Sequence, residues 1–136
     1  MAAQRINPST LSTPMAAYSQ VVRKGSLVTT AGMVSLDAEG NVVGEGDIEA
    51  QTRQTLENVK AALAAAGASM DDVIKTTIFI SDFANYKAMN AVYDEYFKDA
   101  PPARSTIRAD LVLPALLIEI EAMAVVDQAG ERLSVE

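Results

Sequence analysis

The sequence contains no cysteine and no histidine. The absence of cysteine excludes disulfides, thiolate nucleophiles and cysteine metal ligands. The absence of histidine removes the commonest metal ligand and the usual general base near neutral pH. A metal site would therefore need oxygen ligands alone, and the sequence has no EF-hand-like run of Asp and Gly. We expect no metal site.

Positive charge is also scarce. Eleven Lys and Arg stand against eighteen Asp and Glu, which gives a formal net charge of −7 and a pI near 4.5. The basic residues are scattered, whereas binding a phosphate backbone requires them to cluster. We expect no nucleic-acid partner.

Long apolar runs are missing as well. None approaches the roughly 20 residues needed to span a bilayer, and residues 1 to 20 lack the apolar core of a signal peptide. We therefore expect no membrane partner and a cytoplasmic location.

The chain has enough apolar residues, 49%, for a core, and its 136 residues predict a single domain over 1–136 with a polar C-terminal tail at 127–136. Periodicity and turn residues predict α+β elements in the order β-β-α-β-α-β-β, forming a mixed sheet. The expected elements are two strands within 17–35, a helix between Asp47 and Gly67, a strand in 72–82, a helix over 83–97 and two strands within 101–126.

Two helices can cover only one face of such a sheet. Yet the last strand is apolar on both sides, with Ile118 and Ile120 on one face and Leu117 and Met123 on the other. An apolar face left in water would be a large adhesive patch. The sequence therefore predicts a homo-oligomer.

Charged residues interrupt the two C-terminal strands. If the second strand folds back on the first, Arg104 and Arg108 approach Glu119 and Glu121, although the register cannot be read from sequence. One interpretation is a set of cross-strand salt bridges. The other is a ligand pocket at a subunit boundary, in which Arg104 clamps a substrate carboxylate and a glutamate activates water. The pattern alone leaves both open.

A polar residue also lies within an apolar helix stripe. Asn90 shares the stripe of Tyr86, Tyr93 and Phe97, and a carboxamide among aromatic rings must be hydrogen-bonded. It is either an interior residue satisfied by the backbone or a group that lines a pocket.

The segments "PPARSTIRADL" and "IEIEAMAVV" resemble the "PARS" and "IEIEA" motifs of the RidA/YjgF family of reactive enamine/imine deaminases. The resemblance extends over about residues 6 to 126 and includes "YSQVV" and the segment from Gln51 to Phe97. It implies a chorismate-mutase-like α+β fold with two helices on one face, assembled as a homotrimer with pockets between subunits. It also implies 2-iminobutanoate/2-iminopropanoate-type deaminase activity, a hydrolysis that releases 2-keto acids and ammonia without an organic cofactor or metal.

The same resemblance implies roles for individual residues. Arg104 is expected to anchor the substrate carboxylate and Glu119 to position or deprotonate water. The remaining substrate-binding residues would be Tyr18, Ala31, Gly32, Asn90 and Thr106.

The sequence departs from the family at two motifs. The usual Gly-Pro before the tyrosine reads Ala16-Ala17 in front of Tyr18. The usual Ser-Gly-Gln reads Ala31-Gly32-Met33, so a hydroxyl that would contact the substrate is absent. This departure keeps a non-catalytic trimer that binds keto or amino acids as the main alternative. A ribonuclease or translation inhibitor is a weaker alternative, because the chain lacks histidine and is acidic.

Overall fold

The computed structural model describes residues 2–127. Its main elements, in chain order, are β1 (Gln4–Ile6), β2 (Val21–Lys24), β3 (Leu27–Thr30), β4 (Met33–Val34), α1 (Ile48–Ala65), β5 (Val73–Ile80), α2 (Tyr86–Phe97), β6 (Ala103–Arg108) and β7 (Ile118–Val125). Short 3-10 turns at Met70–Asp72 and Phe83–Asn85 precede β5 and α2.

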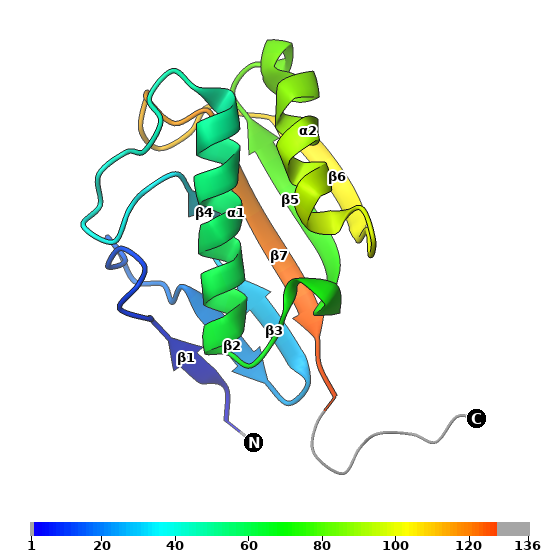
Figure 1. The fold of residues 1–136 in the computed structure, drawn as a ribbon. Helices are drawn as coiled ribbons and strands as arrows, with labels where there is room; N and C mark the ends of the chain where they lie inside the picture. The colour runs from blue at the N-terminus through cyan, green and yellow to red at the C-terminus, as the bar shows by residue number, and fades with distance from the viewer. Residues whose placement is uncertain (1, 128–136) are drawn as a thin grey trace.

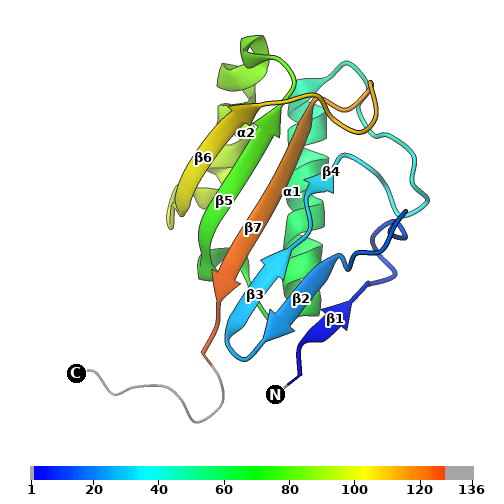
Figure 2. The same ribbon diagram turned by 180° about the vertical axis from the view of Figure 1, so that it is seen from behind.

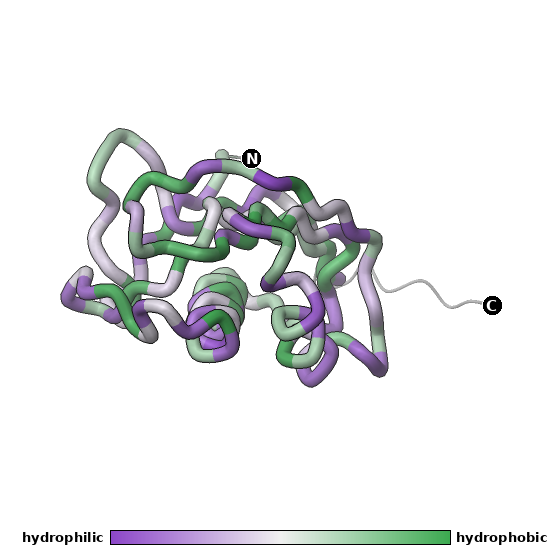
Figure 3. The backbone as a smooth tube through the Cα atoms, turned by 90° about the horizontal axis from the view of Figure 1, so that it is seen from above, coloured by the Kyte–Doolittle hydropathy of each residue, from purple (hydrophilic) through white to green (hydrophobic). Residues whose placement is uncertain are grey.

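The strands form one mixed sheet of order β1-β2-β3-β7-β5-β6, with β4 pairing with the first half of β7 beside β3. Both helices pack on the same face of this sheet, as Figure 1 and the end-on view of Figure 3 show. Seen from behind, in Figure 2, the opposite face carries no helix. The predicted α+β fold, with a mixed sheet and two helices on one face, is confirmed.

The helix α1 begins and ends where the sequence predicts. The Asp47 side chain accepts a hydrogen bond from the backbone N–H of Ala50, which satisfies one of the free donors of the first turn. Gly67, with φ of +82°, follows the last turn, in a conformation that favours glycine. Between these ends Leu56, Val59 and Leu63 are fully buried against the sheet.

The strands β6 and β7 are not neighbours, contrary to the predicted fold-back. Helix α2 carries the chain back along β5, so β6 enters the sheet parallel to β5 at the outer edge. The strand β7 then pairs antiparallel with the other side of β5. A helical crossover allows β6 to run parallel to β5 and pair with it. A hairpin after β6 would instead have placed β6 directly beside β7.

Two short strands were not predicted separately. The strand β1 has only three residues, two of them polar, and pairs with β2 at the far edge. The chain after β3 breaks at Ala31 and Gly32 before β4 resumes pairing with β7. From residue 128 on, the polar tail expected at 127–136 lies outside the described residues.

The face without helices carries exposed apolar side chains. They come from three strands of the sheet: Leu27 of β3, Ile107 of β6, and Met123 and Val125 of β7. This is the uncovered apolar face that the helix count predicted, and we call these four residues the open-face patch. Separately, within residues 2–127 no helix has the length and apolarity to cross a membrane.

Candidate functional site

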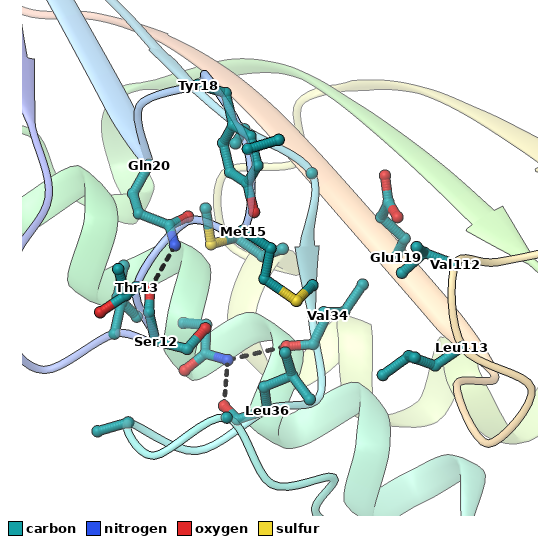
Figure 4. Close-up of a pocket in the computed structure, with 18 of the residues that line it drawn as sticks. Ser12, Thr13, Met15, Tyr18, Gln20, Val34, Leu36, Val112, Leu113 and Glu119 are labelled. Carbon is teal, nitrogen blue, oxygen red and sulfur yellow. Dashed lines mark hydrogen bonds between the residues drawn. The ribbon is translucent and has the colours of Figure 1, made fainter.

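A cavity of about 950 Å³ lies where β3 gives way to β4, beside the start of β7. Figure 4 shows Tyr18 and Glu119 entering it from different segments. Most of its lining is apolar, and the predicted residues Tyr18, Ala31, Gly32 and Glu119 all contribute to it. The apolar lining residues include Leu11, Met15, Met33, Val34, Leu36, Val112 and Leu113.

The carboxylate of Glu119 lies directly against Gly32. A Cβ atom added to Gly32 would overlap Glu119 Oε2 and would lie 2.7 Å from Cδ. Glycine at position 32 therefore makes room for the carboxylate. Burial raises the pKa of Glu119, and the nearby negative charge of Glu121 raises it further. A carboxylate with a raised pKa is better suited to accept a proton near neutral pH.

Replacing Gly32 by alanine should displace this carboxylate while leaving the fold intact, because the collision involves only the far end of one side chain. For the imine hydrolysis that the family resemblance leads us to expect, kcat should fall by about tenfold or more, since a misplacement of about 1 Å costs up to 10²-fold. Steady-state kinetics with a circular dichroism melt would test this. Gly46→Ala is the control, because it makes the same change outside the cavity, where an added Cβ meets no atom within 4 Å. An equal loss of kcat in both variants would contradict the role of Gly32.

Buried amides hold the loops that form the cavity. The Asn58 amide donates to the carbonyl oxygens of Val34 and Leu36, at 2.9 Å each, and the Gln20 amide donates to the carbonyl of Ser12 at 2.7 Å (Figure 4). Such bonds between a side chain and the backbone satisfy groups that would otherwise be buried and unpaired. They fix both walls of the cavity relative to α1 and β2.

Buried Gln51 holds the loop that precedes β7. Its Nε2 donates to the carbonyl oxygens of Gly44 and Ala115, and its Oε1 accepts from the backbone N–H of Leu117 at 2.8 Å. This residue therefore ties helix α1 to the chain segment that delivers Glu119.

Arg104 belongs to a second cluster, on β6 and α2. Its Nη2 donates to the hydroxyl of Tyr86 at 2.9 Å, and its guanidinium carbon lies 4.8 Å from the centre of the Tyr93 ring and 5.7 Å from that of Tyr86. Cation–π contacts of this kind orient a guanidinium group. The cluster presents a fixed cation at the sheet edge.

Asn90 and Thr106 lie in this second region. Asn90 follows Tyr86 by one helical turn, and its Oδ1 is buried without a hydrogen-bond partner among the described residues. Thr106 is half-buried two residues after Arg104, on the same face of β6. The backbone therefore does not satisfy the oxygen of Asn90, and its role as a pocket-lining group stays a prediction.

Within one chain Arg104 and Glu119 do not meet. Arg104 pairs in register with Thr76, which is fully buried under the helices, whereas Glu119 pairs with Phe79 on the open face. The strand β5 also separates them, which places the backbones of β6 and β7 about 10 Å apart. The interpretation of Arg104, Arg108, Glu119 and Glu121 as cross-strand salt bridges is therefore wrong. Among the described residues, Arg53 of α1 forms an ion pair with Glu95 of α2 at 2.9 Å.

Sequence reasoning missed part of both regions. The exposed apolar residues Met15 and Val112, both in loops, line the cavity, but single apolar residues in loops carry no periodic signal. Tyr86 was assigned to the core stripe of its helix, yet 40% of its surface is exposed.

Residues 9–126 match the family model described as "Endoribonuclease L-PSP". A RutC family protein of Pyrococcus horikoshii is 43% identical over 111 residues, which cover 82% of this chain and 88% of that protein. The chain and this relative are therefore similar over most of their lengths.

Solved structures agree with the sequence match. A Rid-family protein from Yersinia pestis is 35% identical with a TM-score of 0.85, covering 92% of this chain and 100% of its own. TdcF of E. coli, solved with bound serine, is 34% identical with a TM-score of 0.84, covering 91% and 99%. The family match over residues 9–126 includes the residues that line the apolar cavity and the strand β6, which carries Arg104.

Proposed function

This chain is a member of the RidA/YjgF family, and we propose that it hydrolyses reactive 2-imino and 2-enamino acids to 2-keto acids and ammonia. The observation that carries the proposal is the Glu119 carboxylate, half-buried against Gly32 in a mostly apolar cavity, with a raised pKa. Such a group accepts a proton from water at a pH where an exposed carboxylate is a weak base.

The reaction requires few groups. The enamine first tautomerises to the imine. Glu119 takes a proton from water as the oxygen adds to the imine carbon and passes this proton to the imine nitrogen, which gives a neutral carbinolamine. Glu119 then takes the proton of the carbinolamine hydroxyl and delivers it to the nitrogen as the C–N bond breaks, which releases ammonia and leaves the C=O group of the keto acid. Because the imine is already reactive, fixing its carboxylate and one water supplies much of the acceleration.

We place the substrate carboxylate on Arg104 of a neighbouring subunit. Arg104 and Glu119 occupy opposite faces within one chain, so one chain supplies only half of the proposed site. A homotrimer that covers the open-face patch would unite the two halves at each of three equivalent boundaries. The exposed Leu27, Ile107, Met123 and Val125 support such an assembly.

Met123→Asp should dissociate the trimer, because it introduces a charge into the patch at a residue that is 38% exposed and belongs to neither half-site. Light scattering after size exclusion should give a mass of three 14.4 kDa chains for the wild type and less for the variant. Lys60→Asp, on the outer surface of α1, is the control. A Met123→Asp protein that stays assembled would contradict this use of the patch.

The test of activity uses an imino acid generated in place. An amino acid oxidase releases the imine, semicarbazide competes for it, and faster keto-acid formation in the presence of the protein demonstrates hydrolysis. A range of amino acids supplied to the oxidase outlines the accepted side chains. No acceleration with any imine would overturn the deaminase.

A non-catalytic trimer that binds amino or keto acids is the second candidate. It is favoured by Ala31, which puts a methyl group where the family resemblance expects a hydroxyl. The bound serine in TdcF concerns that protein, but it supports the idea that a small amino acid fits such a site. Binding of a keto acid without imine hydrolysis would identify this function. The family's ribonuclease name finds little support in a chain with no histidine and a net charge of −7.

A further inference from the structure

The hydroxyl of Tyr86 lies where a ligand of Arg104 would bind. Arg104 Nη2 donates to this hydroxyl at 2.9 Å, so the two groups are adjacent at the edge of the sheet. Tyr86 is 40% exposed, whereas neighbouring Tyr93 is 5% exposed. An anion that approaches the exposed side of the guanidinium therefore also approaches the Tyr86 oxygen.

The hydrogen-bonding arrangement leaves the Tyr86 proton to face such an anion. A phenol has one O–H donor and also accepts. Its oxygen accepts from Arg104 Nη2 at 2.9 Å. Because the oxygen is the acceptor in this bond, the hydroxyl proton points away from the guanidinium and is available to another acceptor. A carboxylate, which only accepts, is the complementary group.

Tyr93 cannot serve in the same way. Its hydroxyl forms a buried hydrogen bond of 2.7 Å with the hydroxyl of Thr76, and its ring lies under the guanidinium. Tyr93 therefore supports Arg104 from the core side, while Tyr86 flanks it on the exposed side.

We propose that Tyr86 is a second carboxylate-binding residue, which donates its hydroxyl proton to one carboxylate oxygen while Arg104 binds the other. Asn90 is then a positioning residue that orients the hydroxyl, and this accounts for a carboxamide on an aromatic stripe. The inference rests on the proposed function to the extent that Arg104 holds the substrate carboxylate. Beyond that function, the inference adds Tyr86 as a binding residue. Because Tyr86 and Arg104 each bind one carboxylate oxygen, the pair selects ligands with a free carboxylate.

The test is the binding of 2-oxobutanoate to the full chain by titration calorimetry, which does not require turnover. Tyr86→Phe keeps the ring and loses the hydroxyl, so we expect the Kd to rise about tenfold, the effect of removing one hydrogen bond to a charged group. Tyr96→Phe is the matched control, because it makes the same change on the same helix where the hydroxyl donates to Glu57 instead. Its Kd should equal that of the wild type.

The pH dependence of 2-oxobutanoate binding distinguishes a tyrosine that binds the ligand from one that only supports the fold. Contacts with Asn90 and then Arg104 lower the pKa of Tyr86 below 10.0. Among the described residues, charged Arg104 of β6 faces this hydroxyl, and the pKa of Tyr93 on the same helix is raised by burial. Above the Tyr86 pKa the phenolate cannot donate and repels a carboxylate, so wild-type affinity should fall at alkaline pH while Tyr86→Phe shows no such fall.

The outcomes separate this inference from the proposed function. If Arg104→Ala abolishes binding but Tyr86→Phe has the wild-type Kd and the same alkaline profile, the Tyr86 inference alone is overturned. If Arg104→Ala binds as well as the wild type, the carboxylate anchor and the proposed function fail together. A wild type that does not bind 2-oxobutanoate overturns both.

Discussion

Arg104→Ala is expected to lower kcat/KM for 2-imino acids by about 10²- to 10³-fold, the effect of losing two hydrogen bonds to a charged carboxylate. The fold should persist, because the guanidinium lies at the sheet edge and its ring partners remain packed. The imine assay with semicarbazide competition measures the rate, and a thermal melt measures the fold.

Two further variants sharpen this result. Arg104→Lys keeps the charge but not the planar pair of donors, so it should recover only part of the activity. Arg108→Ala removes an exposed arginine from the same strand and should leave the rate within about twofold of the wild type, as surface changes usually do. Equal losses at positions 104 and 108 would point to general electrostatics and would contradict a specific anchor.

Glu119→Gln is expected to lower kcat by about 10²- to 10⁴-fold, the usual contribution of a general base. In the wild type, kcat should fall as the pH decreases through the pKa of Glu119, because the protonated carboxyl cannot accept the proton of water. Since burial raises that pKa, the fall should begin at a higher pH than for an exposed glutamate. A rate profile from acid to neutral pH measures this limb.

Glu121→Gln is the matched control, because it changes the same residue type on the same strand face. The negative charge of Glu121 contributes to the raised pKa of Glu119, so its removal should shift the acid limb to lower pH and preserve the maximal rate. A Glu121→Gln protein as inactive as Glu119→Gln would contradict the assignment of the base.

The Glu119→Gln substitution should also change the stability of the fold, and the raised pKa of Glu119 gives the direction of this change. The folded state raises the pKa of this carboxyl, so it binds the proton more tightly than the unfolded chain, and ionisation weakens folding above the unfolded value of about 4.3. Glu119→Gln should therefore raise the melting temperature near neutral pH. The difference should disappear as the pH falls and the wild-type carboxyl becomes protonated.

Mixing the two inactive variants tests whether one site uses two chains. If Arg104 and Glu119 come from neighbouring subunits, trimers refolded from equal amounts of Arg104→Ala and Glu119→Gln should regain about a quarter of the wild-type activity, because a quarter of the boundaries carry both intact residues. If both residues acted within one chain, every site would remain defective and the mixture would stay inactive.

The sequence by itself determined the local elements and the chemistry that is missing. Asp47 and Gly67 bound α1 through capping and a left-handed turn, and the β-branched run of β5 formed the strand it predicts. These features depend on residues close in sequence, so periodicity and turn preferences reveal them. The count of two helices likewise predicted the uncovered face.

Only the tertiary structure decided which charged groups meet. The expected proximity of Arg104 and Glu119 assumed adjacent strands, but the α2 crossover inserts β5 between them and the pleat directs their side chains to opposite faces. Strand order and register depend on contacts between distant residues, which a local pattern does not encode. For the same reason, the sequence did not reveal that the Glu119 carboxylate packs against Gly32. It also did not reveal that the Arg104 guanidinium packs against the rings of Tyr86 and Tyr93.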